Sequence, residues 1–349
     1  MKNLNNTRIV RILRIIMPIV GIITAVIFVP WNAIWLLVTP LSDTVQEELD
    51  NAVDYGFDGI IVYVDQPDEA PAFYASGWNN RVEQVQADPQ SLFKIGSISK
   101  LYVATITAML VNDGRLSLDD TLADYLPEMV GRIEYAEQIT LRMMLQHRSG
   151  IPNFVDHPDY PWFESLPDIN AYLEFAIDEP ADFEPDKRYS YSNTNYLLIG
   201  TILDSVLGYS HHQYIESEIL VPLGLTDTYS LLSQVDSAEV MSGYHYDVEP
   251  DLLDIDFIVT GGSMVATAQD VGIFLRALND GSLLNADEQA IYSAIYEYEH
   301  TGWLPGYQSI ARYYEETDTV VVQFVNSTGG ETETILRLVF DRIVRLVSR

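Results

Sequence analysis

The sequence Phe93-Lys94-Ile95-Gly96-Ser97-Ile98-Ser99-Lys100 places a serine one helical turn before a lysine, directly after a short apolar segment. On a helix, side chains three residues apart share a face, with β-carbons about 5 to 6 Å apart. A helix that begins at Ser97 brings its hydroxyl to the Lys100 amine, at the positive end of the helix dipole. This pattern is typical of an activated nucleophile, although an N-cap serine beside a solvated lysine gives the same four letters.

A second copy of the pattern, Ser91-Leu92-Phe93-Lys94, shows that S-x-x-K alone is a weak signal. Ser91 leads into a predicted strand, where residues three apart point to opposite faces. The segment from Ile98 to Val111 instead has apolar residues at helical spacing and is followed by Asp113-Gly114, which predicts a helix. We therefore assign the nucleophile to Ser97.

The composition is that of a folded protein: 48% of the 349 residues are hydrophobic, with no low-complexity tract. Cysteine is absent, which excludes thiol nucleophiles, thiolate metal sites and disulfides. The histidines His147, His211, His212 and His245 have no companions at metal-ligand spacing, so neither a metal nor another cofactor is expected.

The N-terminus carries an uncharged run from Ile15 to Ser42, which exceeds the roughly 20 residues that cross a bilayer. Basic residues precede this run: Lys2, Arg8, Arg11 and Arg14. We expect residues 1–14 to be a cytoplasmic N-terminus, 15–41 a transmembrane signal anchor in the lipid bilayer, and 42–349 an extracytoplasmic domain of a single-pass protein. A cleaved signal peptide is the alternative, but Trp31-Asn32-Ala33 is a poor small-x-small cleavage site.

The region after residue 41 is strongly acidic. Its 15 Lys and Arg face 51 Asp and Glu, a net charge of 15 − 51 = −36. Such a charge excludes nucleic acid as a partner. It serves solubility, or it is an adaptation to high salt, where counterions screen the repulsion between like charges.

Strand patterns lie at both ends of this region and helix patterns lie between them. The predicted strands are 59–65, 70–77, 295–301, 307–314 and 319–326; the predicted helices are 43–55, 98–111, 140–146, 170–178, 195–207, 268–279 and 331–347. This order predicts an α/β (α+β) fold with one antiparallel sheet flanked by helices. The sheet part covers about 42–96 and 250–349, and a helical insertion covers about 97–249, with the active site between them.

Two further polar motifs follow the serine in the sequence. Tyr191-Ser192-Asn193 is the one Tyr-x-Asn of the chain and lies between Lys187-Arg188 and a predicted helix. His300-Thr301-Gly302 is the one basic-Thr-Gly tripeptide and lies on a predicted strand. Acyl transfer needs a proton relay, an oxyanion hole and a substrate anchor, and these motifs offer the required groups.

In this order, S-x-x-K, Y-x-N and H-T-G resemble the serine β-lactamase and penicillin-recognising family, in its class C β-lactamase, D-alanyl-D-alanine carboxypeptidase and esterase branch. Further segments match the family: 114–120, 125–128, 145–152, 222–228 and 261–267. The likeness extends over roughly residues 43–349 and implies a β-lactamase/transpeptidase-like fold.

The resemblance implies a role for each motif residue. Ser97 attacks a carbonyl to form an acyl-enzyme, while Lys100 and Tyr191 share the proton transfers, and either of them could be the base. Asn193 holds Lys100 and the acyl side chain. The substrate is further bound by His300, Thr301 and Gly302, and the backbone N–H groups of Ser97 and Trp303 form the oxyanion hole.

Departures from the family pattern narrow the function. Class C β-lactamases usually have lysine where this chain has His300, which moves the expectation toward D-alanyl peptide carboxypeptidase or esterase activity. Glu299 beside His300 is expected to favour the imidazolium form. We therefore expect a membrane-anchored serine hydrolase acting on small amide, ester or peptide substrates. A β-lactamase and a non-catalytic binding module are the alternatives, while an α/β-hydrolase is excluded because no G-x-S-x-G occurs.

Overall fold

The computed structural model describes the backbone of residues 2–249 and 251–349, and their side chains except at 2–9, 22–23 and 26–28. The structure therefore does not describe the side chains of Lys2 and Arg8, which belong to the predicted basic N-terminus. It also does not describe residue 250, the predicted boundary between the helical part and the sheet part. The chain divides into two compact units, Met1–Pro40 and Leu41–Arg349.

The N-terminal unit differs from the single membrane-spanning helix predicted for residues 15–41. It contains two helices, α1 (Lys2–Phe28) and α2 (Trp31–Val38). Pro30 separates them, because proline lacks the backbone N–H that would continue the hydrogen-bond ladder. In the part of the chain that the structure describes, no helix meets the length and apolarity required to cross a membrane.

The second unit is built on a six-stranded antiparallel sheet in the order β3-β2-β1-β10-β9-β8. Its strands are β1 (Gly59–Asp65), β2 (Ala72–Asn80), β3 (Val85–Gln86), β8 (His300–Leu304), β9 (Tyr307–Tyr314) and β10 (Thr319–Val325). The central pair β1 and β10 joins residues far apart in sequence, with Ile60 opposite Val325. The N- and C-terminal parts of the domain thus close one sheet, as predicted.

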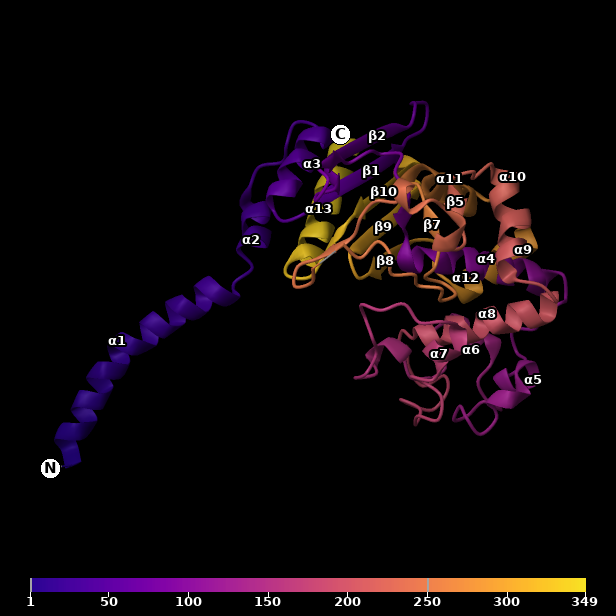
Figure 1. Ribbon diagram of the computed structural model, residues 1–349, viewed down its shortest axis with the longest axis horizontal. Coiled ribbons are helices and arrows are strands. Elements are labelled where there is room, and N and C mark those ends of the chain that lie inside the picture. Colours follow the sequence, from indigo (N-terminus) through magenta and orange to yellow (C-terminus); the bar gives the residue numbers. More distant parts are fainter. Residues whose placement is uncertain (1, 250) are drawn as a thin grey trace. The chain divides into compact units, whose positions relative to one another are not determined.

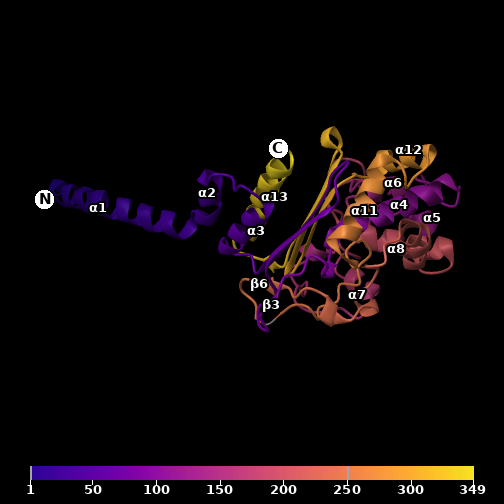
Figure 2. The same cartoon turned by 90° about the horizontal axis from the view of Figure 1, so that it is seen from above.

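Helices cover both faces of this sheet (Figures 1 and 2). The terminal helices α3 (Val45–Asp54) and α13 (Thr332–Val347) pack on one face, while α4 (Ser99–Asn112) and α11 (Ala268–Asp280) lie on the other. Burial on both faces explains why β1 and β10 are nearly continuous apolar runs rather than alternating ones. Between the terminal helices, the carboxylate of Glu48 accepts two hydrogen bonds from Arg342, at 2.6 and 2.9 Å.

The helical part surrounds α4, in which every residue from Ser99 to Leu110 is buried. A helix that is apolar on all sides belongs in a core. The other helices of the domain are α5 (Leu122–Tyr125), α6 (Leu141–Leu145), α7 (Ile169–Leu173), α8 (Asn193–Leu207), α9 (His211–Ile215), α10 (Val221–Leu223) and α12 (Ala286–Ile295). Short strands complete the domain: β4 (Phe93–Lys94), β5 (Thr228–Tyr229) and β7 (Val265–Ala266) form one small sheet, and β6 (Tyr244–His245) with β11 (Ser327–Thr328) forms another.

The strand predicted at 295–301 is wrong in position. Residues Ala286–Ile295 form α12, which the prediction missed, and the edge strand β8 begins only at His300. The helix starts with a capping box, in which Asn285 and Glu288 exchange hydrogen bonds with each other's backbone N–H groups. The helix overlaps the predicted strand only at Ile295, and residues 296–299 belong to neither a helix nor a strand.

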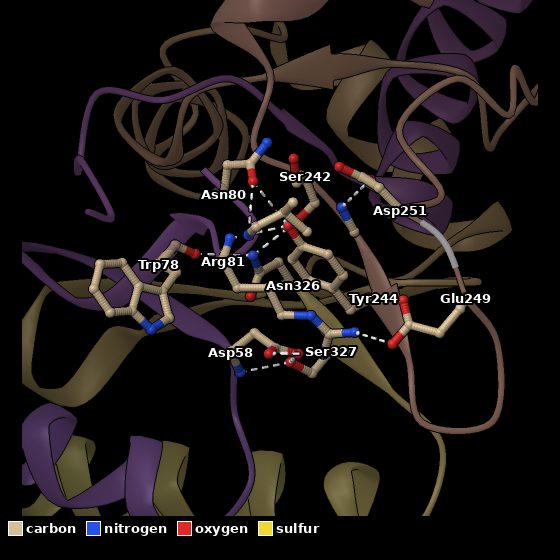
Figure 3. A network of polar contacts seen from close by, with 12 residues as sticks. Asp58, Trp78, Asn80, Arg81, Ser242, Tyr244, Glu249, Asp251, Asn326 and Ser327 are labelled. Carbon is tan, nitrogen blue, oxygen red and sulfur yellow. Dashed lines mark hydrogen bonds and ion pairs between the residues drawn. The ribbon is translucent and has the colours of Figure 1, made fainter. Parts of the chain in front are cut away.

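A polar network ties the end of β2 to the segment around β6 (Figure 3). The Arg81 guanidinium binds Asp58 at 3.0 Å and Glu249 at 3.2 Å, and it stacks on the ring of Tyr244. Asn326 donates from its amide to the carbonyl oxygens of Trp78 and Ser242. These contacts fix the sheet edge that is opposite to β8.

Candidate active site

Ser97 lies where the chain passes from β4 into α4. Residues Gly96–Ile98 form a 3₁₀ turn, and the α-helix itself begins at Ser99, two residues later than a helix starting at Ser97. The Lys100 Nζ lies 3.0 Å from the Ser97 Oγ, and the Tyr191 hydroxyl donates to the same oxygen at 2.9 Å. Two groups that can exchange protons thus flank one hydroxyl.

Lys100 is almost completely buried. Its Nζ donates to the Asn193 Oδ1 and to the carbonyl oxygen of Gly261, both at 2.9 Å, besides contacting Ser97. Burial lowers the pKa of Lys100 to about 7. Because no carboxylate lies among these partners to hold the proton, a large fraction of Lys100 is neutral near pH 7.

Tyr191 has the opposite tendency. Burial raises the pKa of its hydroxyl well above the ordinary value, and the hydrogen bond to Ser97 only partly offsets this rise. The ring stacks on the imidazole of His147, with the centroids 4.3 Å apart. Tyr191 therefore carries its proton at neutral pH, whereas a large fraction of Lys100 has lost its proton.

Asn193 holds Lys100, while its own amide is held in turn by Asn153. The Asn153 Oδ1 accepts from the Asn193 backbone N–H at 2.9 Å and from its side-chain Nδ2 at 3.3 Å. Asn153, which was not predicted as a site residue, directly follows the family segment 145–152. The Asn193 amide, which is expected to contact the acyl side chain of the substrate, therefore also donates to Asn153.

Strand β8 lies against the turn that carries Ser97. Gly96 has a positive φ of 55°, and a β-carbon there would approach the backbone nitrogen of Trp303 to 3.1 Å. A β-carbon at Gly302 would overlap the carbonyl oxygen of Ile95 and the Ser309 hydroxyl. Glycine at both positions lets the backbones of Ser97 and Trp303, the two predicted oxyanion donors, come together.

His300 is neutral, contrary to the expectation that Glu299 would favour imidazolium. The His300 Nδ1 donates to the carbonyl oxygen of Thr301 at 2.5 Å, so the Nε2 accepts from the Tyr296 hydroxyl at 2.9 Å. Burial and the charge of Lys100 lower the pKa of His300 to about 4. Glu299 points elsewhere and pairs with Arg312 at 3.4 Å.

A pocket of about 330 Å³ opens above Ser97 and is called the acyl pocket below. Thr301 and His300 line it together with an apolar wall of Phe154, Tyr160, Trp162, Phe257, Val259 and Trp303. Among the described residues that line it, none is Asp, Glu, Lys or Arg. This pocket suits an uncharged apolar group.

The second S-x-x-K copy is not assembled as a site. The Nζ of Lys94 donates to the carbonyl oxygens of Leu252, Leu253 and Ile255, at 3.3, 2.5 and 2.8 Å. Lys94 thus holds the segment that leads to Phe257 and Val259 of the acyl pocket. In the region covered by residues 2–249 and 251–349, no cluster of His, Asp and Glu is arranged to hold a metal ion.

The fold and the Ser-Lys-Tyr arrangement define a class of proteins built for acyl transfer through serine. The chain belongs to the Beta-lactamase family, whose sequence profile matches residues 41–294, and the resemblance stated above is thereby confirmed.

Relatives within this family have several activities. Penicillin-binding protein 4 of Amycolatopsis lactamdurans is 32% identical over 160 residues, which are 45% of this chain and 41% of that protein. The chain spans between 41% and 66% of the length of three curated relatives. The D-amino acid amidase of Ochrobactrum anthropi SV3, in complex with L-phenylalanine, superposes with a TM-score of 0.77 at 25% identity, over 87% of this chain and 98% of the amidase. A penicillin-binding protein from Bacillus halodurans shares the fold, with a TM-score of 0.71 at 21% identity, over 84% and 99%.

Proposed function

We propose that this protein is a serine hydrolase that cleaves esters or amides with an uncharged, apolar acyl group through an acyl-enzyme on Ser97. The observation that carries this proposal is the position of the Ser97 Oγ, 3.0 Å from Lys100 and 2.9 Å from Tyr191, at the base of the acyl pocket. A nucleophile between a base and an acid is the arrangement that acyl transfer needs.

Acylation begins with neutral Lys100. It takes the proton of Ser97 while the Oγ bonds to the carbonyl carbon, and the electron pair of the carbonyl moves to its oxygen. The backbone N–H groups of Ser97 and Trp303 then stabilise that negative oxygen. When the intermediate collapses, the bond to the leaving group breaks and Tyr191 supplies its proton. Lys100 ammonium restores the proton of Tyr191.

Deacylation runs through the same groups with water as the nucleophile. The water oxygen bonds to the acyl carbon while its proton passes to Lys100. The Ser97 Oγ then leaves the carbon and recovers a proton from the relay of Lys100 and Tyr191. The free acid departs and the resting state returns.

The charge of the site favours ester or simple amide substrates over D-alanyl peptides. A peptide carboxylate needs a cation, but His300 is neutral and the lining of the acyl pocket, as far as the structure describes it, has no Lys or Arg. A D-alanyl carboxypeptidase and a β-lactamase stay as alternatives, since relatives include a putative D-alanyl-D-alanine carboxypeptidase of Escherichia coli, 29% identical over 153 residues. D-amino acid amides are a further candidate substrate class, by analogy with the D-amino acid amidase.

One experiment separates these activities. The intact mass of the protein is measured after treatment with a fluorophosphonate and, separately, with a penicillin. Labelling by fluorophosphonate with no penicilloyl adduct and no penicillin hydrolysis is the expected result, and Ser97→Ala should abolish the labelling. A stable penicilloyl adduct would indicate a peptidase, and rapid penicillin turnover a β-lactamase. No adduct with either reagent would indicate the non-catalytic binding module.

We also propose that residues 15–41 attach the protein to a lipid bilayer, with the hydrolase domain on the extracytoplasmic side. Support comes from the uncharged run after Arg14 and from Trp31 and Trp35 near its end. The full chain should sediment with membranes and resist extraction by alkaline carbonate, and its domain should be digested by protease added to intact cells. Recovery in the soluble fraction contradicts this proposal.

A further inference from the structure

A second cavity lies next to the acyl pocket and is called the rear cavity here. Its volume is about 260 Å³, and it shares Tyr191 and His300 with the acyl pocket, so these side chains form walls of both. The other side chains that matter to the argument are those of His147, Tyr189, Tyr296 and Glu297. The mechanism above uses none of these four.

The walls of the rear cavity are aromatic. The imidazole of His147 lies 4.3 Å from the ring of Tyr191, 5.9 Å from Tyr189 and 6.3 Å from Tyr296, measured between centroids. The ring of Tyr296 in turn stacks parallel to His300. The rings of Tyr189, Tyr191 and Tyr296 thus line this space together with the imidazoles of His147 and His300, which stack on Tyr191 and Tyr296. The faces of such rings attract cations, and quaternary ammonium groups in particular.

The charge of the rear cavity is negative. Glu297 is the one charged side chain among its described lining residues, and it has no ion pair with a described cation. The cations that neighbour the lining residues in the sequence or pair with Glu299 have other contacts: Arg148 binds Asp186, Arg188 lies over the ring of Phe183, and Arg312 binds Glu299. His147 adds no positive charge, since burial and Lys100 lower its pKa to about 3. Burial and then the charge of Glu297 raise the pKa of Tyr189, which indicates that the carboxylate acts on these rings.

The position of Tyr191 connects this cavity to the reaction. Tyr191 hands its proton to the leaving group, so that group must depart on the side of Tyr191. We propose that the rear cavity binds the leaving group of the substrate, and that the preferred leaving group is an alcohol or amine that also carries an ammonium cation. This inference rests on the proposed function. In the acylation step the Ser97 Oγ–carbon bond forms, the carbon–oxygen bond to the amino alcohol breaks, and Tyr191 protonates the departing oxygen.

A pair of esters of equal shape tests the inference. Benzoylcholine carries a quaternary ammonium, and 3,3-dimethylbutyl benzoate is its uncharged isostere. We expect kcat/KM to favour benzoylcholine about tenfold, and Glu297→Gln to reduce the ratio of the two kcat/KM values at least fivefold. Glu299→Gln is the matched control, because it removes an equal charge two residues away, on a side chain that faces Arg312. Equal use of the two esters by the wild type overturns the inference while the proposed function stands.

If neither ester is hydrolysed, that result contradicts the proposed function but not the inference about the rear cavity. A binding measurement then tests the inference on its own. Phenyltrimethylammonium is titrated into the Ser97→Ala protein by calorimetry in 0.5 M salt, which screens the general negative field of the chain. We expect saturable binding that Glu297→Gln weakens at least fivefold and Glu299→Gln leaves unchanged. Absence of binding, or an equal effect of both substitutions, overturns the inference.

Discussion

Lys100 and Tyr191 flank the same oxygen but differ in how readily each releases a proton. Burial disfavours the charged form of both, and so it produces a neutral amine beside a neutral phenol. A neutral amine and a neutral phenol stand together at neutral pH, and none of their hydrogen-bond partners that the structure describes is a carboxylate. The pKa of Lys100 at about 7 sets the lower pH limit of such a site.

The pH profile of acylation tests the role of Lys100. Only the neutral amine accepts the Ser97 proton, and below a pKa of about 7 its fraction falls tenfold per pH unit. We expect kcat/KM for a neutral ester to rise from pH 5 to 7 and to level off above. Lys94 shares a pKa of about 7 but bonds to carbonyl oxygens away from Ser97, so the inflection should persist in Lys94→Met. A profile that is flat from pH 5 to 9 contradicts the assignment.

The Tyr191→Phe variant tests whether the Tyr191 hydroxyl protonates the leaving group. Removing a positioned general acid costs about 10²- to 10⁴-fold when the leaving group needs a proton. We expect a loss of that size with alkyl esters and amides, and a loss at least tenfold smaller with p-nitrophenyl esters, whose leaving group is stable as an anion. Equal losses with both kinds of ester would assign Tyr191 a role in holding Ser97 rather than in protonation.

At the scale of elements, the contact between β8 and the turn before α4 brings together the two predicted oxyanion donors, the backbone N–H groups of Ser97 and Trp303. In Gly302→Ala the added methyl group overlaps the Ile95 carbonyl oxygen, so β8 must move away from Ser97. A displacement of about 1 Å can cost about 100-fold in rate. We therefore expect kcat/KM to fall about 100-fold while circular dichroism still shows a folded protein. Gly21→Ala, which has open space around the new methyl group, should keep full activity.

The two terminal helices are joined by the buried pair of Glu48 and Arg342. Glu48→Gln removes the carboxylate charge that the buried Arg342 guanidinium binds, so it should lower the free energy of unfolding by about 3 kcal/mol in urea titrations. Glu333→Gln breaks an exposed pair with Arg337 on the same helix and should cost less than about 0.5 kcal/mol. Similar effects of the two substitutions would mean that the buried pair contributes little.

The same pair makes stability depend on pH. Burial acts to raise the pKa of Glu48, but hydrogen bonds from Arg342 and Ser42 outweigh burial and bring the pKa below its ordinary value. The folded state therefore binds this proton less readily than the unfolded state does. The resulting stabilisation is complete above the ordinary pKa of a glutamate and is lost as the pH falls through the lowered one. The Glu48→Gln protein should lack this component.

Local patterns predicted the elements whose own sequence decides them. The bounds of β1 and β9 match the prediction, because their runs of β-branched and aromatic residues lie between clear turn signals. The strand predicted at 295–301 was wrong for its first five residues, because α12, which a capping box starts, ends only at Ile295 and β8 begins at His300. In the site, the proximity of Ser97 and Lys100 follows from one helical turn. Tyr191, 94 residues away, could be paired with Ser97 only by family resemblance.

Asn153 and the rear cavity show what no local pattern could reveal. Asn153 acts through hydrogen bonds to a residue 40 positions away. The rear cavity exists only where α12 and the segments before α8 meet, and α12 itself was not predicted. A site whose side chains come from several elements can be recognised only in the folded structure.

At the scale of the whole molecule, the net charge of −32 destabilises the folded chain, because its many carboxylates repel one another. Salt shortens the range of this repulsion from about 10 Å at 0.1 M to about 3 Å at 1 M. We expect the melting temperature to rise by several degrees between 0.05 and 2 M KCl. Exchanging the exposed Asp159, Glu164 and Glu179 for amides should raise it at low salt and reduce its salt dependence. A flat response would show that the acidity serves solubility alone.

The pairing of β1 with β10 has a consequence for biosynthesis. A ribosome that has delivered Ser97, Lys100 and Tyr191 has not yet made β8, which abuts the Ser97 turn, or β10, the central neighbour of β1. Pairing across more than 250 residues is slow and must wait until β10 has been synthesised. The nascent chain thus carries Ser97 in an incomplete environment, and the site is assembled only after β8 and β10 have been synthesised.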